Sequence, residues 1–220
     1  MHWCSELSWG NSQFALRGVA DESKKWRDGT ILKVQFLDGD QSQIDYALWA
    51  MSQWQQYVNL KFVVVDKSGV IRVSFKGDHA WSWVGTDALT VLDRAQPTVT
   101  LGGFTGNQSE DNLKWEVLHE FGHVLCLKHE MYNHSIPWNK KAIYEYYTEH
   151  YKWTKEMVDH NLFDVNKIYT SLTPPDQDSV MMYPIPPEFT DGKFVALDPH
   201  PELSMLDVRA ISELYPIRGR

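Results

Sequence analysis

Apolar side chains recur along the chain with two spacings, and these spacings predict its strands and helices. In residues 30–37, Leu32, Val34 and Phe36 alternate with polar side chains, and this period of two is typical of a half-buried strand. Similar patterns predict further strands over residues 61–65, 70–75, 81–85 and 98–101. We therefore expect a sheet formed by the first half of the chain.

Spacings of three and four residues predict helices between and after these strands. One helix follows Asp40, whose side chain is suited to cap it. The best-marked helix follows Ser109 and has an acidic first turn, which favours a helix N-terminus. Its apolar stripe consists of Leu113, Val117, Leu118, Phe121 and Val124. Residues 138–153 also show near-helical spacing, and a last helix is expected to begin at Ser204 and Asp207.

Composition narrows the class of protein. The chain has 220 residues, 43% of them hydrophobic, and a chain of this length buries enough surface for one compact domain without disulfides. Its two cysteines, Cys4 and Cys126, form no CxxC pair, which excludes a disulfide-rich scaffold and a zinc ribbon. The formal net charge of -8 argues against nucleic acid and anionic membranes as partners. No apolar run reaches the roughly 18 residues of a membrane span, and no export signal is visible.

The predicted helix after Ser109 carries two histidines with the spacing of metal ligands. His119 and His123 are four residues apart, so they lie one turn and about 6 Å apart on one face of the helix. A catalytic zinc site uses three protein ligands and leaves one position for water. His129 is the candidate third ligand, and the chain has to turn after His123 to bring this imidazole back. Glu120, next to the first histidine, is the natural general base for water.

The segment 119–129, with the sequence HEFGHVLCLKH, resembles the HExxHxxGxxH motif of the metzincin zinc peptidases. Glu130, directly after the third histidine, narrows the resemblance to the astacin family. Residues 179–184, with the sequence SVMMYP, are similar to the SxMxY element of that family, which contains the Met-turn. By this resemblance Met181 lies beneath the metal as a structural floor, and the oxygen of Tyr183 binds zinc or stabilises the oxyanion.

The resemblance covers roughly residues 26–216 and implies both a fold and an activity. The fold is α+β: an upper subdomain, residues 26–129, has a twisted mixed sheet with two long helices above the cleft, and a lower subdomain, residues 130–220, is mostly irregular with a C-terminal helix. The activity is that of an endopeptidase with one catalytic Zn²⁺, acting on a protein or peptide that lies along an edge strand near residues 81–89. We further expect a monomer that is secreted.

One position departs from the family pattern. The glycine of the motif is replaced by Cys126, at a place where the chain adopts a left-handed conformation that glycine reaches without steric cost. A cysteine in that conformation costs on the order of 1–2 kcal/mol. Because the three histidines, the glutamate and Tyr183 all occur in order, we expect the active site to be intact and the turn to be altered but not abolished.

Two other classes of protein remain open. A zinc-bearing domain that binds peptides without cutting them has Cys126 as its only support in the sequence. A serine or cysteine hydrolase is a poor alternative, because the chain has no GxSxG elbow and only one cysteine near a histidine cluster. The other histidines lack paired spacing and are predicted to be ordinary surface or core side chains: His2, His79, His134, His150, His160 and His200.

Cys4 raises a hypothesis about latency. Residues 1–25 show no sustained periodicity and precede the family resemblance, so they are predicted to form an N-terminal arm of the kind that a short propeptide provides. A cysteine thiolate is a soft zinc ligand, and by occupying the fourth position it keeps a zinc enzyme inactive as a zymogen. The alternatives for Cys4 are a surface thiol, a packed side chain or a disulfide with Cys126.

If Cys4 is an inhibitory zinc ligand, Cys4→Ala or proteolytic removal of the arm raises peptidase activity, because the position for water becomes free. The thiol in the intact protein then resists alkylation until zinc is chelated, which mass spectrometry detects. A fully active intact chain whose activity is the same after Cys4→Ala contradicts the hypothesis, and the arm is then only an extension.

Overall fold

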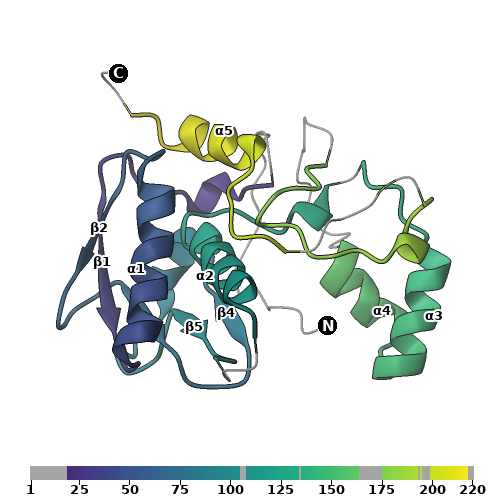
Figure 1. Ribbon diagram of the computed structural model, residues 1–220, viewed down its shortest axis with the longest axis horizontal. Coiled ribbons are helices and arrows are strands. Elements are labelled where there is room, and N and C mark those ends of the chain that lie inside the picture. Colours follow the sequence, from purple (N-terminus) through teal and green to yellow (C-terminus); the bar gives the residue numbers. More distant parts are fainter. Residues whose placement is uncertain are drawn as a thin grey trace.

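The computed structural model describes residues 19–104, 108–133, 135–163, 175–192, 194 and 199–217. One long helix, α2, lies in the middle of the molecule, with the sheet and α1 on one side and α3 and α4 on the other, while α5 lies above α1 and α2 in the view of Figure 1. The helices are α1 (Gln41–Gln55), α2 (Glu110–Val124), α3 (Lys140–Tyr151), α4 (Lys155–Val158) and α5 (Met205–Leu214).

Five strands form one mixed sheet in the order β2-β1-β3-β5-β4. The strands are β1 (Ile31–Phe36), β2 (Lys61–Val64), β3 (Ile71–Ser74), β4 (Ala80–Ser82) and β5 (Val99–Leu101). Neighbouring strands are parallel, except that β4 and β5 are antiparallel. Because β4 is the last strand in the order, it forms an edge to which an extended peptide can add as a further strand.

The main hydrophobic core lies between the sheet and the helices α1 and α2. At the start of α1, Asp40 and Gln43 form a reciprocal capping box, as the sequence predicts for Asp40. Near its end, the fully buried indole of Trp54 donates a hydrogen bond of 3.0 Å to the carbonyl of Leu118 in α2. Leu118 directly precedes the first histidine of the predicted zinc site, so the core fixes where that histidine lies.

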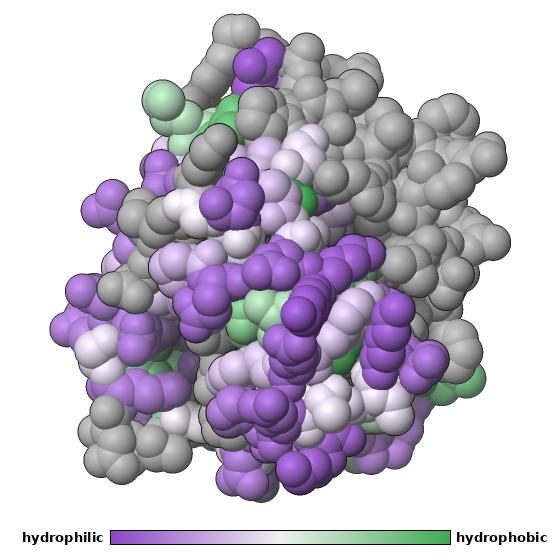
Figure 2. Space-filling view, turned by 90° about the vertical axis from the view of Figure 1, so that its right-hand side faces the viewer, coloured by the Kyte–Doolittle hydropathy of each residue, from purple (hydrophilic) through white to green (hydrophobic). Residues whose placement is uncertain are grey.

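A second hydrophobic core supports the half of the molecule that contains α3 and α4. Ile143 and Tyr147 of α3 are buried in it, and the Tyr147 ring stacks on Trp153 with 5.0 Å between centroids. Where its residues are described, the face of the molecule that carries α3 and α4 is largely hydrophilic (Figure 2), and α3 turns Ile143 and Tyr147 inward. None of the helices in the described ranges has the length and apolar character that crossing a bilayer requires.

Residues 19–25, the end of the predicted arm, pack against the rest of the domain. The backbone N–H of Asp21 donates to the carbonyl of Cys126 at 3.0 Å. The ammonium group of Lys24 is almost wholly buried and forms ion pairs with Asp87 at 2.5 Å and with Asp21 at 3.6 Å. Removing one partner of a buried ion pair leaves an uncompensated charge at a cost of several kcal/mol, so this pairing holds the segment in place.

The α+β fold is confirmed, and the predicted strands and long helices are observed with small shifts of their ends, with one exception. The strand predicted over residues 81–85 is wrong after its first residues, because β4 ends at Ser82 and a 3₁₀ helix begins at Gly85. The edge strand near residues 81–89 is therefore shorter than expected. Gly85 has a φ of +52°, and a Cβ there would lie 2.1 Å from the carbonyl oxygen of Lys24, so the chain turns at this close contact.

Candidate functional site

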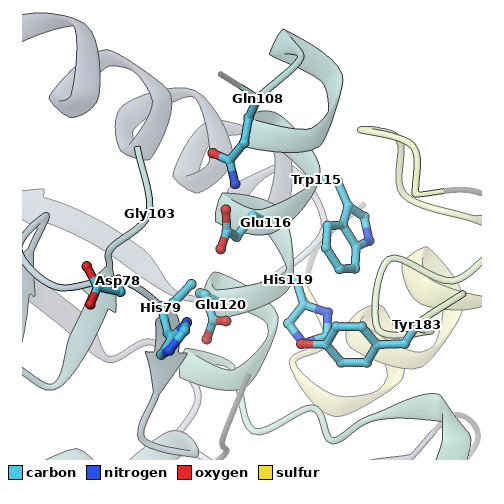
Figure 3. Close-up of a pocket in the computed structure, with 10 residues that line it drawn as sticks. Asp78, His79, Gly103, Gln108, Trp115, Glu116, His119, Glu120 and Tyr183 are labelled. Atoms are coloured by element: carbon cyan, nitrogen blue, oxygen red, sulfur yellow. The ribbon is translucent and has the colours of Figure 1, made fainter. Parts of the chain in front are cut away.

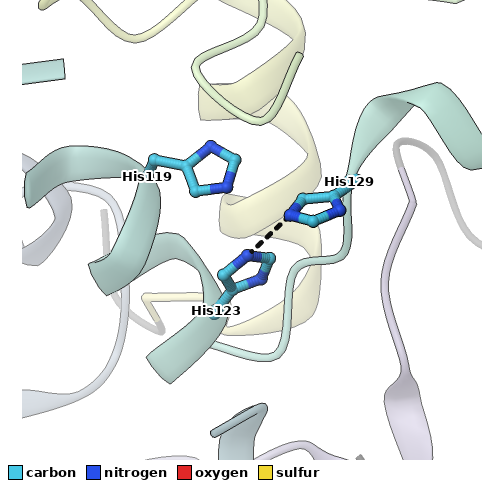
Figure 4. A group of neighbouring side chains, drawn as sticks. All are labelled: His119, His123 and His129. Atoms are coloured by element: carbon cyan, nitrogen blue, oxygen red, sulfur yellow. Dashed lines mark hydrogen bonds between the residues drawn. The ribbon is translucent and has the colours of Figure 1, made fainter. Parts of the chain in front are cut away.

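Three histidines converge at the end of α2 and in the segment that follows it. His119 and His123 project from α2, and His129 returns to face them (Figure 4). One nitrogen atom from each ring lies within 4.8 Å of the others, and the Nε2 atoms of His123 and His129 are 3.1 Å apart. Two nitrogens bound tetrahedrally to one zinc ion at about 2.0–2.1 Å are roughly 3.3 Å from each other. The arrangement therefore fits a single zinc ion.

Backbone carbonyls determine which nitrogen of the His119 ring and of the His123 ring can bind a metal ion. The Nδ1 atom of His119 donates to the carbonyl of Val180, and the Nδ1 atom of His123 donates to the carbonyl of Leu127, each at 2.8 Å. Because a carbonyl oxygen can only accept, each Nδ1 carries the proton and each Nε2 keeps its lone pair. Metal-binding histidines are commonly oriented by such outer hydrogen bonds.

Burial sets the charge state of the histidine cluster. The three rings are buried, with exposed fractions of 3% or less. Burial, followed by the effect of the neighbouring His123, lowers the pKa of His119 and of His129 well below its usual value. These rings are therefore neutral, which is the form of imidazole that binds a metal ion.

A helix-ending turn brings the third histidine back to the other two. Cys126 has a φ of 68°, so it adopts the left-handed conformation that the sequence analysis expects. The N–H of Leu127 donates to the carbonyl of Gly122 at 3.0 Å, and the N–H of Cys126 donates to the carbonyl of His123 at 2.9 Å. This pair of bonds is the Schellman motif that ends many helices, and it forms here without the usual glycine. The turn is thus preserved in the presence of Cys126.

The thiol of Cys126 is not available as a nucleophile. The side chain is free and fully buried, and the Tyr215 hydroxyl lies 3.5 Å from its sulfur. Burial raises the pKa of the Cys126 thiol to about 12, so the reactive thiolate does not form near neutral pH. This environment argues against the cysteine hydrolase considered above.

The predicted Met-turn packs directly against α2. A Cβ at Gly122, between the two histidines of the helix, would lie 2.4 Å from the sulfur of Met181. The carbonyl of Met181 accepts a 2.9 Å hydrogen bond from the N–H of Glu130, the residue after the third histidine. Met181 therefore contacts both segments that carry histidines.

The first turn of α5 holds the Met-turn through a buried carboxylate that sequence reasoning predicts only as part of a helix cap. Asp207 accepts hydrogen bonds from the Ser179 hydroxyl at 2.7 Å and from the N–H of Val180 at 3.0 Å. It also accepts a 3.1 Å bond from the N–H of Ser204, the N-cap of α5. Since the carbonyl of Val180 accepts from His119, a chain of hydrogen bonds connects α5 to the first histidine.

Glu120 and Tyr183 line one cavity of about 90 Å³ beside the histidine cluster (Figure 3). Glu120 is fully buried on α2, and Tyr183 reaches over from the Met-turn, with its ring centroid 5.0 Å from that of His119. The ring of Trp115 packs edge-on against Tyr183 at 5.5 Å and contacts His119 at 5.3 Å. The geometry thus places a carboxyl group, a phenol and an imidazole around one small space.

The structure brings together the candidate residues of α2 and the Met-turn, and Cys4 lies outside the described residues. Sequence reasoning missed several residues of the cavity, among them His79, Trp115 and Glu116. Helical spacing could have found the last two, because Trp115 lies one turn before His119 and Glu116 one turn before Glu120. His79 comes from the segment before β4, and no local pattern connects it to α2.

Comparisons with known proteins give matches among solved structures. A scan against models of protein families and a search of curated proteins find no match. The chain is 30% identical to a structure of myroilysin, with a TM-score of 0.81 over 91% of this chain and 100% of that chain. A crystal structure of myroilysin also matches at 30% identity, with a TM-score of 0.65 over 92% of this chain and 90% of that chain.

A more distant match shares the fold alone. High choriolytic enzyme 1, a hatching enzyme zinc-protease from the medaka fish Oryzias latipes, has 16% identity and a TM-score of 0.58 over 90% of this chain and 96% of that chain.

The mixed sheet, the histidines of α2 and the Met-turn beneath them define the metzincin class of zinc peptidases. Within this class, the identity over the whole of myroilysin shows that the chain belongs to the astacin family.

The hydrogen bonds of Asp207 predict an effect on metal affinity. Asp207→Asn replaces one acceptor oxygen by a donor amide, so the Met-turn loses bonds that hold the Val180 carbonyl against His119. We expect zinc affinity, measured by competition with a chromophoric chelator, to fall by roughly tenfold or more. The control is Ser204→Ala, which weakens the cap of α5 by about 1 kcal/mol but keeps the bond from Val180 to Asp207. Equal zinc affinities in the two variants would contradict this role of Asp207.

Proposed function

We propose that this protein is a zinc-dependent endopeptidase that hydrolyses peptide bonds in proteins. The observation that carries the proposal is the convergence of buried, neutral imidazoles with the carboxyl group of Glu120 beside one small cavity. Membership of a zinc-peptidase family supports the same conclusion. The proposed substrate is a protein or peptide, and we propose that the enzyme is a secreted monomer.

His119, His123 and His129 are the residues that would hold one Zn²⁺ ion. When bound, zinc supplies Lewis acidity, which polarises a carbonyl group and lowers the pKa of water. Glu120 stands apart from the nitrogen cluster and faces the cavity, which leaves its carboxylate for proton transfer. In the proposed reaction, Glu120 accepts a proton from the water that attacks the scissile carbonyl and then passes it to the leaving amine.

Tyr183 and the edge of the sheet complete the proposed mechanism. The hydroxyl oxygen of Tyr183 points toward the side of the cavity where His119 and Glu120 lie (Figure 3). From there it can donate a hydrogen bond to the oxygen that gains negative charge in the tetrahedral intermediate. The substrate would lie extended along β4, where backbone hydrogen bonds align it without requiring a particular sequence.

The alternative is a zinc-bearing domain that binds peptides and no longer cuts them. Turnover of casein that stops after treatment with a metal chelator and returns with added Zn²⁺ supports the peptidase. Binding of zinc and peptides without any cleavage would support the alternative instead. The preserved turn at Cys126 supports the peptidase over this alternative.

Glu120→Gln should separate proton transfer from metal binding. This change keeps the size of the side chain but removes its basicity, so we expect kcat to fall roughly 100-fold or more while zinc content stays near one ion per chain. Substitution of His119, His123 or His129 by alanine should instead lose zinc and activity together. Zinc analysis and peptide cleavage on the same samples measure both effects. Retained turnover in Glu120→Gln would end the assignment of Glu120 as the base.

Tyr183→Phe removes only the hydroxyl group from the cavity. If this hydroxyl stabilises the transition state, kcat and kcat/KM should fall together by roughly tenfold or more, with zinc retained. Tyr132→Phe is a matched control, because the Tyr132 ring packs at 5.6 Å from His129 but does not line the cavity. An unchanged kcat in Tyr183→Phe would mean that Tyr183 has only a packing role.

A further inference from the structure

The cavity beside the catalytic centre contains two carboxyl groups that the proposed mechanism does not use. Besides His119, Glu120 and Tyr183, it is lined by Glu116 of α2 and by Asp78 before β4. Glu116 and Glu120 lie one turn apart on the same face of α2 (Figure 3). Since the cavity shares its wall with the residues assigned to catalysis, whatever fills it lies next to the scissile bond.

On the side away from His119, where zinc would be held, the described lining of this cavity is acidic. Neither lysine nor arginine is among the described residues that line it, and His79 is the other titratable side chain besides those already named. The polar neighbour of Glu116 is the amide of Gln108, whose nitrogen points at the carboxylate (Figure 3). Burial raises the pKa of Glu116 to about 7, so its carboxyl group is partly protonated near neutral pH and ionises when a cation lies beside it.

The cavity has room for part of a substrate side chain. About 90 Å³ exceeds the roughly 30 Å³ that one water molecule occupies in the liquid, so there is room for a short unbranched chain. The side chains of lysine and arginine combine a narrow aliphatic stem with a terminal positive charge, so they can place that charge beside the carboxyl groups of Glu116 and Asp78.

We infer that Glu116 determines specificity in this enzyme: with Asp78, it makes the cavity a subsite for a lysine or arginine side chain of the substrate, adjacent to the bond that is cut. This inference rests on the proposed peptidase function and adds a substrate class to it. Glu116 forms a charge-assisted hydrogen bond with the entering side chain, while Gln108 keeps the carboxylate facing the cavity.

Three fluorogenic peptides test the subsite on the zinc-loaded full chain. They are identical except for lysine, norleucine or glutamate at one position beside the scissile bond, which a peptide library first identifies. We expect kcat/KM for the lysine peptide to exceed that for the norleucine peptide by roughly tenfold or more. Glu116→Gln should remove this preference, leave the norleucine peptide nearly unchanged and raise cleavage of the glutamate peptide.

Glu110→Gln is the matched control for the loss of one carboxylate from α2. Glu110 is exposed, pairs with Lys114 at 2.6 Å and does not line the cavity, so its removal should leave all three rates unchanged. The inference is wrong if the wild-type enzyme shows no preference for lysine or arginine. It is also wrong if Glu116→Gln lowers the three rates in equal proportion, because a purely structural defect would do that.

A binding measurement tests the subsite independently of peptidase activity. Butylguanidine and its neutral counterpart butylurea are titrated onto the zinc-loaded protein and followed by nuclear magnetic resonance. We expect the wild-type protein to bind butylguanidine more tightly than butylurea. We expect the Glu116→Gln variant to bind both probes weakly and with the same affinity. If no peptide is cut but this dependence on Glu116 is observed, the peptidase function fails and the cation subsite stands. Equal binding of both probes to the wild-type protein overturns the subsite.

Discussion

Placing three imidazoles together in the buried interior is the constraint on which this structure depends. Each ring must carry its proton on the side away from the metal position, and a buried N–H group needs an acceptor there. For His119 and His123 the acceptors are backbone carbonyls, which come from Val180 and Leu127. Neither carbonyl belongs to a helix or strand, so the two irregular segments that supply them have to be held by the remainder of the fold.

Two different sets of contacts hold the segments that contain Leu127 and Val180. Leu127 is fixed locally, by the turn that ends α2 and by an antiparallel bridge to Ala20. Val180 is fixed at a distance, by the carboxylate of Asp207 at the start of α5. The sheet and α1 position α2, but the last elements of the chain position the carbonyl that orients its first histidine. Regions that look peripheral in the sequence therefore contribute directly to the proposed metal site.

The sequence predicts the features that depend on neighbouring residues. The spacing of His119 and His123, the cap at Asp40 and the left-handed turn at Cys126 all follow from local geometry, and the structure shows each of them. The sequence does not predict features that depend on contacts between distant segments. The predicted strand stops at Ser82, and Gly85 just beyond it lies against the backbone of Lys24, some 60 residues earlier in the chain. The role of Asp207 likewise depends on a partner that lies far away in sequence.

Gly122 shows what this arrangement costs the helix that carries the histidines. Glycine lowers helix stability by about 1 kcal/mol relative to alanine, and here it occupies the last turns of α2. A Cβ at this position would collide with the sulfur of Met181, so even alanine would displace the Met-turn. An attempt to make the protein more heat-stable by replacing helical glycines would thus disturb the proposed metal site at this one position. In directed evolution of this enzyme, residue 122 is therefore best excluded from the mutated set.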